Sequence, residues 1–167
     1  DSSEYGSLLR EKQKIRFFYG IDNKDIKLYT QAALKKGGVF SFHILQMLER
    51  RLDNVVFRLG FAESRRQARQ MVTHGLVQIG NGSKPAGPKT VRTPSYEIRK
   101  GEGISLKEGS TKSPLVTAVE QRIKKYEPPQ WLQIDKVKRV GTVLRAPEEG
   151  DLEIMFDASK IKEFYSR

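Results

Sequence analysis

Arginine chemistry is concentrated between residues 64 and 75, in the stretch SRRQARQMVTHG. Arg65, Arg66, Arg69 and His74 lie there, and no acidic residue follows Glu63 as far as residue 82. A guanidinium is planar, stays charged, and can bind two oxygens of one phosphate or stack on an unpaired base. The stretch therefore favours binding of a polyanion, provided that a single element presents these side chains together.

A short helix is predicted to carry this stretch. Ser64 and Gln67 have the spacing of a capping box, and Gly75 supplies the left-handed residue after the helix end. The unpaired amides of such a start suit a phosphate. At about 100° per residue, one side of the helix is apolar and the opposite side is basic and polar. The apolar side holds Ala68, Met71 and Val72, and the basic side holds Arg65, Arg66, Arg69, Gln70 and Thr73.

An arginine-rich helix face is often only a solvated surface, and that is the alternative to phosphate binding. Two features of the helix favour binding: its charge has one sign, and arginine outnumbers lysine. A third feature is the proline-rich loop that follows, which adds Lys84, Lys89 and Arg92. Binding through such side chains would release counterions, so we expect the affinity to fall steeply with salt.

The whole chain has the same bias. Its 167 residues include 31 Lys and Arg against 20 Asp and Glu, a formal net charge of +11 that is spread along the chain. This is typical of a nucleic-acid partner. With no cysteine and two histidines, disulfides and an ordinary zinc site are excluded, and we expect no metal and no cofactor. We also expect no membrane span and no signal peptide, because no apolar run is long enough to cross a bilayer and no leader opens the sequence. We expect no enzymatic centre, because no nucleophile–base pair, phosphate loop or acidic cluster is present.

Around the basic helix, helical and strand-like patterns predict an α+β fold. Helices are expected at 7–19 and 25–36, and from about 41 to 59 as one long helix or two that meet near Arg50. The remaining expected elements are a strand at 76–79, two strands within 95–109 about a turn at 100–103, a helix at 113–126 with Ser113 as N-cap and Pro114 as its first residue, a loop at 127–135, short strands at 141–147 and 151–156, and a short helix or turn at 157–167 capped by Asp157.

Several of these segments also resemble a known family. ERRLDNVVFRLGFAESRRQARQMVTHG (49–75) and PSYEIRKGEGI (94–104) are similar to the RNA-binding domain of bacterial-type small-subunit ribosomal protein S-four. LREKQKIRFFYG (9–20), PPQWLQID (128–135) and EFYSR (163–167) resemble other parts of the same family. The resemblance runs through almost the whole chain in order.

The resemblance implies a fold in two parts. A discontinuous, mainly helical domain would consist of 1–48 together with 110–167, in which Phe164 and Tyr165 pack back on the N-terminal helices. An RNA-binding module of two helices packed on a small β-sheet, 49–109, would be inserted between them. The chain also departs from the pattern of the family in three ways. Leu76 replaces a usual histidine, the 80–93 loop is longer, and the N-terminal segment that carries zinc-binding cysteines in some members is not within these residues.

The implied function is that of a primary binder of small-subunit (16S-type) ribosomal RNA. Such a protein nucleates assembly of the 5′ region of that RNA. It lies near the mRNA entry channel beside neighbouring small-subunit proteins and contributes to decoding accuracy. The implied location is the ribosome, in the cytoplasm or in an organelle, with no membrane and no small-molecule substrate as partner.

With that function in view, the candidate RNA-binding residues fall into four groups. The basic helix and its start contribute Ser64, Arg65, Arg66, Gln67, Arg69, Gln70 and His74. The preceding segment contributes Arg50, Arg51 and Arg58, unless one of these pairs with Glu49 or Asp53. The first helix contributes Arg10, Lys12, Lys14 and Arg16, and the loop contributes Lys84, Lys89 and Arg92. Four tyrosines could either stack on bases or pack in the core: Tyr5, Tyr19, Tyr29 and Tyr96. For Trp131 we expect an anchoring role in an apolar pocket.

Two other functions use a similar module. Pseudouridine synthases carry a catalytic Asp in an Arg-Leu-Asp motif, and 51-RLD-53 has those letters. Here Asn54-Val55-Val56 follows in place of the usual Thr-Ser-Gly, and too little chain remains for that catalytic domain. A stand-alone ribosome quality-control factor would explain 49–108, but not the similarities at 9–20 and 163–167.

Overall fold

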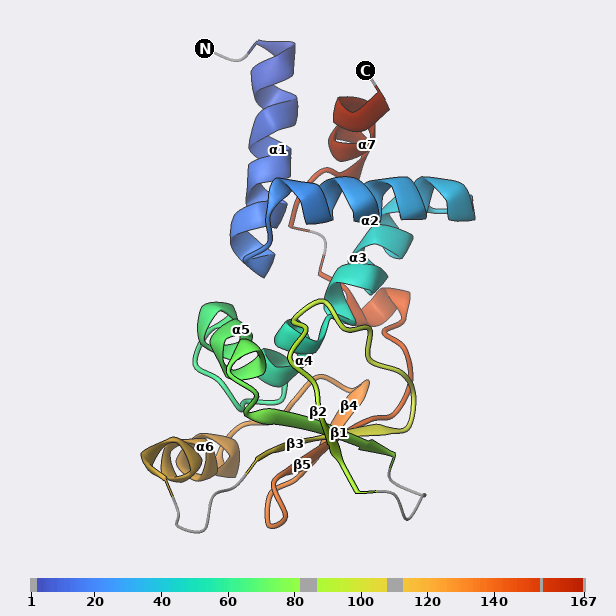
Figure 1. Ribbon diagram of the computed structural model, residues 1–167. Helices are drawn as coiled ribbons and strands as arrows, with labels where there is room; N and C mark the ends of the chain where they lie inside the picture. The colour runs from blue at the N-terminus through green and yellow to red at the C-terminus, as the bar shows by residue number, and fades with distance from the viewer. Residues whose placement is uncertain (1–2, 82–86, 108–112, 154, 167) are drawn as a thin grey trace. The chain divides into compact units, whose positions relative to one another are not determined.

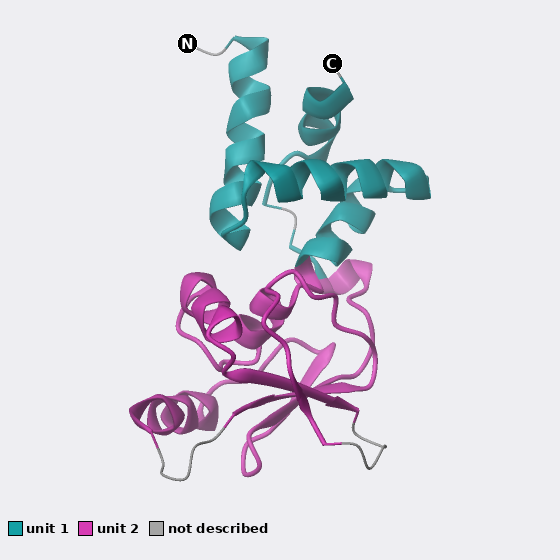
Figure 2. Cartoon of the chain, viewed as in Figure 1, with its two compact units in different colours: residues 1–48, 152–167 teal, residues 49–151 magenta. Residues whose placement is uncertain are grey.

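The computed structural model describes residues 3–81, 87–107, 113–153 and 155–166. The chain divides into two compact units, which we call unit 1 (residues 1–48 and 152–167) and unit 2 (residues 49–151) (Figure 2). The mixture of helices with an antiparallel sheet confirms the α+β fold class. None of the helices in the described ranges is long and apolar enough to cross a bilayer.

Unit 1 is helical. α1 (Glu4–Tyr19) begins at Ser3, whose hydroxyl accepts from the Gly6 amide at 3.0 Å, and ends at left-handed Gly20. α2 (Asn23–Lys36) and α3 (Phe40–Glu49) follow. α7 (Ala158–Ser166) packs against α1 and α2, so that the two ends of the chain form one unit (Figure 1). The helices expected at 7–19 and 25–36 and the terminal helix are confirmed.

The core of unit 1 is apolar, and the last helix contributes to it. Its buried members are Ile15, Tyr19, Ile21, Ile26, Ala33, Ile44, Leu45, Leu48, Phe156, Ala158 and Ile161. Near the C-terminus the Phe164 ring lies 5.8 Å from the Tyr5 ring, centroid to centroid. The ammonium of Lys12 lies 4.6 Å from the centroid of the same Phe164 ring, at a cation–π distance.

Unit 2 packs helices on a five-stranded antiparallel sheet. The strands are β1 (Val77–Asn81), β2 (Lys89–Thr90), β3 (Glu102–Leu106), β4 (Leu132–Asp135) and β5 (Val140–Val143), in the order β2-β1-β3-β5-β4. The helices are α4 (Leu52–Arg58), α5 (Arg65–Thr73) and α6 (Pro114–Lys124), with a 3-10 turn, η1 (Glu149–Asp151). The expected N-cap of α6 is confirmed, because Ser113 accepts from the Val116 amide.

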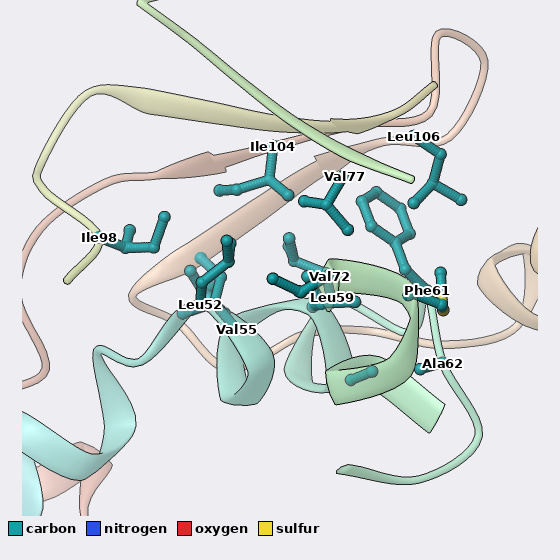
Figure 3. Close-up of a cluster of buried hydrophobic side chains, with 14 of the residues drawn as sticks. Leu52, Val55, Leu59, Phe61, Ala62, Val72, Val77, Ile98, Ile104 and Leu106 are labelled. Carbon is teal, nitrogen blue, oxygen red and sulfur yellow. The ribbon is translucent and has the colours of Figure 1, made fainter. Parts of the chain in front are cut away.

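Side chains of α4 and α5 meet the sheet in one core. Leu52, Val55 and Leu59 face Ile98, Ile104 and Val77 across it (Figure 3). The approach is closest at Gly141 of β5, where a Cβ atom would overlap the side chain of Leu59. Glycine is therefore required at this point of the strand for α4 to lie against the sheet.

The break between α3 and α4 confirms the expectation of two helices that meet near Arg50. Arg51 has extended dihedrals (φ −64°, ψ 140°) and separates the helices. Unit 2 also continues to residue 151, past the expected module boundary at 109, because β4 and β5 extend the sheet.

The first of the two strands expected within 95–109, before the turn at 100–103, is wrong, because residues 95–99 form only an isolated bridge. The segment closes the N-terminus of α4 instead. The carbonyl of Tyr96 accepts from the Leu52 amide at 2.9 Å, and the carbonyl of Pro94 accepts from the Asp53 amide at 3.1 Å. The first amides of a helix have no partner within the helix. The chain therefore meets this need with backbone from a segment about 40 residues later, which a local pattern does not reveal.

Two further expectations near the C-terminus are wrong. The loop expected at 127–135 ends in β4, which pairs with β5 through a turn in which Arg139 has a φ of 56°. The described residues of 151–156 form no strand, and the turn before them is held by the carboxylate of Asp151, which accepts from the Glu148 amide.

Candidate nucleic-acid interface

The start of α5 is built as a cap. The Ser64 hydroxyl accepts from the Gln67 amide at 3.0 Å, which confirms the expected N-cap. The Gln67 side chain reaches back one residue further than a standard capping box requires, because its oxygen accepts from the Glu63 amide at 2.6 Å. Both side chains therefore orient the helix start and are engaged within the protein.

The apolar side of α5 is buried as expected, through Ala68, Met71 and Val72. On the other side Arg66, Gln70 and His74 are exposed, and Arg69 is half-buried. Positions four residues apart share a helix face, so these side chains form a continuous polar and basic stripe. No acidic residue lies within α5.

Arg92 joins this stripe from the loop before the 94–98 segment. Gly75, which ends α5 with a φ of +76°, has the Arg92 guanidinium in the space that a Cβ would occupy. Glycine is thus needed here twice: for the left-handed backbone and for the close approach of the guanidinium. Because residue 75 has no side chain, the Arg92 guanidinium can lie close to the backbone directly after His74. We call the set of Arg66, Arg69, Gln70, His74 and Arg92 the α5 surface.

Arg65 behaves differently from its neighbours. Its Nε donates to the Asn54 Oδ1 at 2.9 Å, and its guanidinium lies 4.6 Å from the centroid of the Phe57 ring. Arg65 therefore joins α5 to α4 rather than projecting from the basic face.

The same Asn54 connects a buried polar network. Its Nδ2 donates to the Glu49 carbonyl at 2.8 Å and to the Glu49 Oε1 at 3.0 Å. Arg58 binds the Glu49 carboxylate with two nitrogens, at 3.1 and 3.0 Å. Asn54 and Glu49 are buried, and buried polar groups are costly unless they are hydrogen-bonded. This network therefore holds the start of α5 on α4.

A second pair lies at the start of α4. Arg51 and Asp53 are 1% and 2% exposed, and two nitrogens of Arg51 bind the Asp53 carboxylate at 3.0 and 2.9 Å. The alternative of pairing with Glu49 or Asp53 thus applies to two of the three residues, Arg58 and Arg51. An Asp53 that is buried and paired is also unable to reach a substrate, which removes the basis of the pseudouridine synthase alternative.

Arg50 lies at the surface but is held by the 94–98 segment. Its Nε donates to the Ile98 carbonyl at 3.1 Å, and its Nη1 lies 2.9 Å from the Glu97 carboxylate, which is 62% exposed. Exposed ion pairs of this kind contribute little to stability. The Glu97 end of this pair is open to solvent while the Arg50 side chain is 21% exposed, whereas both ends of the Arg51–Asp53 pair are buried.

In unit 1 the candidate cations of α1 divide in the same way. Arg10 and Lys14 are exposed and Arg16 is half-buried, whereas Lys12 is 8% exposed beneath the Phe164 ring. Burial lowers the pKa of Lys12, and the nearby charge of Arg16 lowers it further. We therefore call Arg10, Lys14 and Arg16 the α1 surface and leave Lys12 out.

The remaining candidates are the loop lysines, one of which lies on β2, and the aromatic residues. Lys89 is exposed on this edge strand, while Lys84 lies outside the described residues. The Tyr96 hydroxyl donates to the Glu102 carboxylate at 2.7 Å. Burial and this hydrogen bond raise the pKa of Tyr96 to about 12. Among the other aromatic candidates, Tyr19 and Trp131 are buried in the cores of units 1 and 2, and Tyr29 packs against the core of unit 1.

Metal chemistry finds no support in this part of the chain. Over the described ranges, no three His, Cys, Asp or Glu side chains come together in a way that could hold an ion. What the geometry offers is a set of guanidinium groups on one side of α5, which suits the binding of phosphates.

Three features of residues 49–92 have no counterpart among the expectations from sequence: the Asn54 network, the inward turn of Arg65, and the proximity of Arg92 to Gly75. A polar Asn54 inside the apolar run LDNVVF signals a buried hydrogen-bonding role. The position of Arg92 has no comparable local signal, because it joins segments that are separated by a strand.

Comparison with known families divides the chain near the break between α3 and α4. A model described as the S4 domain matches residues 50–84, and a model described as the ribosomal protein S4/S9 N-terminal domain matches residues 1–49. The two matches meet at the break between α3 and α4.

Individual relatives match along nearly the whole chain. The small ribosomal subunit protein uS4 of Syntrophomonas wolfei is 42% identical, over 99% of this chain and 76% of the relative. Proteins of the same name from Persephonella marina and Streptococcus pneumoniae are 45% and 41% identical, over 98% and 99% of this chain and 77% of each relative. These relatives are named as ribosomal proteins and not as enzymes. The chain therefore belongs to the uS4 family of small ribosomal subunit proteins.

Proposed function

We propose that this protein binds small-subunit ribosomal RNA directly, through the α5 surface of unit 2 and the α1 surface of unit 1. The observation that carries the proposal is the one-signed stripe on α5, to which Gly75 adds the guanidinium of Arg92. Two-pronged binding by Arg66, Arg69 and Arg92 suits phosphates, and it needs no rearrangement of the helix.

The internal network supports this function without taking part in it. Arg51, Arg58 and Arg65 are engaged with Asp53, Glu49 and Asn54 respectively. These arginines hold α4 and α5 in place, so we omit Arg51 and Lys12 from the RNA-binding set and assign Arg58 and Arg65 chiefly to positioning.

The finer role that we propose follows from family membership. The protein would act as a primary binder that nucleates folding of the 5′ region of the ribosomal RNA. It would lie beside neighbouring small-subunit proteins near the mRNA entry channel, where it contributes to decoding accuracy. Its location would be the ribosome.

The RNA-binding proposal is tested by replacing Arg66, Arg69 and Arg92 together with Ala. Binding to a transcript of the 5′ region of small-subunit ribosomal RNA is measured at several salt concentrations. We expect weaker binding and a salt slope reduced by up to about one unit for each phosphate that is no longer bound. The fold should persist, because the apolar side of α5 is unchanged.

A matched control removes the same charge elsewhere in unit 2, by replacing Lys124, Lys125 and Lys138 with Ala. All three are exposed. The control should weaken binding much less, since only the long-range field changes. Equal reductions of affinity in the two triple variants would reduce the interaction to net charge and overturn the assignment of the α5 surface.

A second measurement separates an integral ribosomal protein from a transient quality-control factor. In sucrose gradients at high salt, the protein is expected to sediment with small subunits at a constant ratio. Release from the subunits at a salt concentration at which the isolated protein still binds its transcript would contradict the structural role.

A further inference from the structure

The α1 helix carries an aromatic side chain that the core does not use. Phe17 is 76% exposed, the highest value for an aromatic residue among the described parts of the chain. Its neighbours in sequence, Phe18 and Tyr19, pack in or against the core of unit 1. A single exposed apolar side chain is common in soluble proteins. The significance of Phe17 depends on the residues around it.

Phe17 shares a helix face with two cations. Positions 10, 14 and 17 are separated by four and three residues, so Arg10, Lys14 and Phe17 fall within roughly 60° of one another around α1. All three are exposed. The buried side chains of the helix, Leu8, Lys12, Ile15 and Tyr19, lie on the opposite side. We call Arg10, Lys14 and Phe17 the α1 stripe.

Charge on this side of the helix is positive. The acidic residues of α1 are Glu4 and Glu11, and at about 100° per residue both lie outside the stripe. Lys14 does contact Glu11 at 2.8 Å, but its side chain is 55% exposed. The Glu11 side chain is only 12% exposed, so the pair is open to solvent at its lysine end. The Lys14 ammonium has three N–H donors and can bind a phosphate while it stays beside Glu11.

Arg16 borders the ring of Phe17. Its guanidinium carbon lies 5.7 Å from the centroid of the ring, and its Nη1 donates to the Gln13 side chain at 3.3 Å. A cation near one part of the ring leaves the rest of the exposed phenyl surface open to a further flat group. The flat groups that phosphate-rich partners offer are nucleobases.

We propose that Phe17 is a base-stacking residue: its ring stacks on an unpaired base of the bound RNA, while Arg10 and Lys14 bind phosphates of the same strand. This inference rests on the proposed RNA-binding function and adds a single-stranded contact to it. Along the helix, residues 10 and 17 are about 10 Å apart, which suits a stripe that follows a few nucleotides. A phenyl ring stacks on a base only where that base is unpaired, so the contact would be to a loop, bulge or strand end.

The composition of the stripe favours RNA over a protein partner. An apolar pocket of a protein would be met by a cluster of apolar side chains with few charges near its centre. Phe17 instead shares its face with Arg10 and Lys14 and has Arg16 beside its ring, while the buried apolar residues of α1 lie on the opposite side. Aromatic side chains interleaved with cations are the usual arrangement of single-strand binding surfaces.

The test compares two replacements of one side chain in the full chain. F17L keeps an apolar group but removes the ring, whereas F17W keeps a ring. With the ribosomal RNA transcript described above, we expect F17L to weaken binding by about 5- to 150-fold, the range for loss of one stacked base. F17W should bind as well as the wild type. L28A is the matched control, because Leu28 is 54% exposed on α2 of the same unit, and it should leave RNA affinity unchanged.

Salt dependence distinguishes stacking from charge. F17L should lower the affinity by the same factor at every salt concentration, because the protein still binds the same phosphates. R10A and K14A should each reduce the salt slope, by up to about one unit. In F17W the fluorescence of the added indole should be quenched when RNA binds. The wild type serves as the baseline, because its one tryptophan, Trp131, is 1% exposed.

The outcomes separate the two levels of the proposal. A wild-type protein that fails to bind the transcript would overturn the proposed function, and the stacking assignment with it. A wild type that binds, together with an F17L variant that binds equally well, would overturn the stacking assignment alone. A lower melting temperature of F17L without RNA would also count against it, since it would show that the ring is covered within the protein.

Discussion

Two sets of arginines lie within a few residues of each other in unit 2, and they have opposite environments. Arg51, Arg58 and Arg65 bind a buried or partly buried carboxylate or amide at distances near 3 Å. Arg66, Arg69 and Arg92 belong to the α5 surface, where Arg66 and Arg92 are exposed. The same side chain thus positions the helices in one set and serves as the proposed RNA contact in the other.

Adjacency in sequence therefore does not assign a function to an arginine. Arg65 and Arg66 are consecutive, but successive helix residues point about 100° apart. The first meets Asn54 on α4, and the second meets solvent. Partner geometry, and not local charge density, separates the two roles.

The largest effect is expected when the charge of Asp53 is removed. In D53N the buried Arg51 keeps its charge but loses the opposite one, and removing one partner of a buried pair costs about 3–5 kcal/mol. We expect the free energy of unfolding, measured by urea denaturation, to fall by this amount. E97Q, which removes the exposed partner of Arg50, is the matched control and should cost less than about 1 kcal/mol.

The double variant R51M/D53N extends the same test. Removing both charges relieves the unpaired guanidinium, so stability should recover much of the decrease seen in D53N. A D53N variant as stable as the wild type would show that Arg51 is not confined to the interior. Arg51 would then not belong to the set of arginines that position the helices.

A smaller effect is expected at Asn54, which connects the two sets through Arg65. In N54A the Glu49 carbonyl and the Arg65 Nε each lose a hydrogen bond, at a cost of about 1–3 kcal/mol. Under conditions in which N54A is folded, the salt slope of its RNA binding should equal that of the wild type, because no cation of the α5 surface is removed. Q70A, on the exposed side of α5, should leave stability unchanged. A reduced salt slope in N54A would instead place Arg65 among the residues that bind phosphate.

The smallest stability effect, with the clearest consequence for binding, is expected for G75A. A left-handed backbone costs about 1–2 kcal/mol for a residue with a Cβ, and the methyl group would displace the Arg92 guanidinium. We expect weaker RNA binding and a reduced salt slope. G101A has a similar φ of +88° and no neighbouring atom within 4 Å, so it should lower stability and leave binding unchanged. Equal RNA binding by G75A and G101A would dissociate Arg92 from the α5 surface.

Much of the helical structure could be predicted from sequence, because its signals are local. Ser64 with Gln67, Ser113 with Pro114, and the glycines after α1 and α2 mark helix ends within a few residues. The strands were harder. β4 is four residues long, and its partner β5 follows a turn with a left-handed arginine, so neither alternation nor a glycine marks the hairpin.

The residue types of the candidate site could be predicted from sequence, but not which of its arginines face inward and which face solvent. The one-signed charge of residues 64–74 identifies the stripe on α5. Whether an arginine faces inward depends on Asp53, Glu49 and Asn54, whose positions relative to the arginines arise only when α4 and α5 pack together. Phe17 could have been recognised from the spacing of 10, 14 and 17, since the same wheel that groups Leu8 and Ile15 leaves it on the opposite side.

The pairing of α7 with α1 also sets an order of events on the ribosome that makes the protein. The strands described in unit 2 are complete once residue 143 has emerged, whereas α7 of unit 1 follows only with residues 158–166. Chains grow from the N-terminus at about 5–20 residues per second, so α1 and α2 are made before unit 2 but gain their last packing partner after it. α1 and α2 thus stay partly uncovered until α7 has been made.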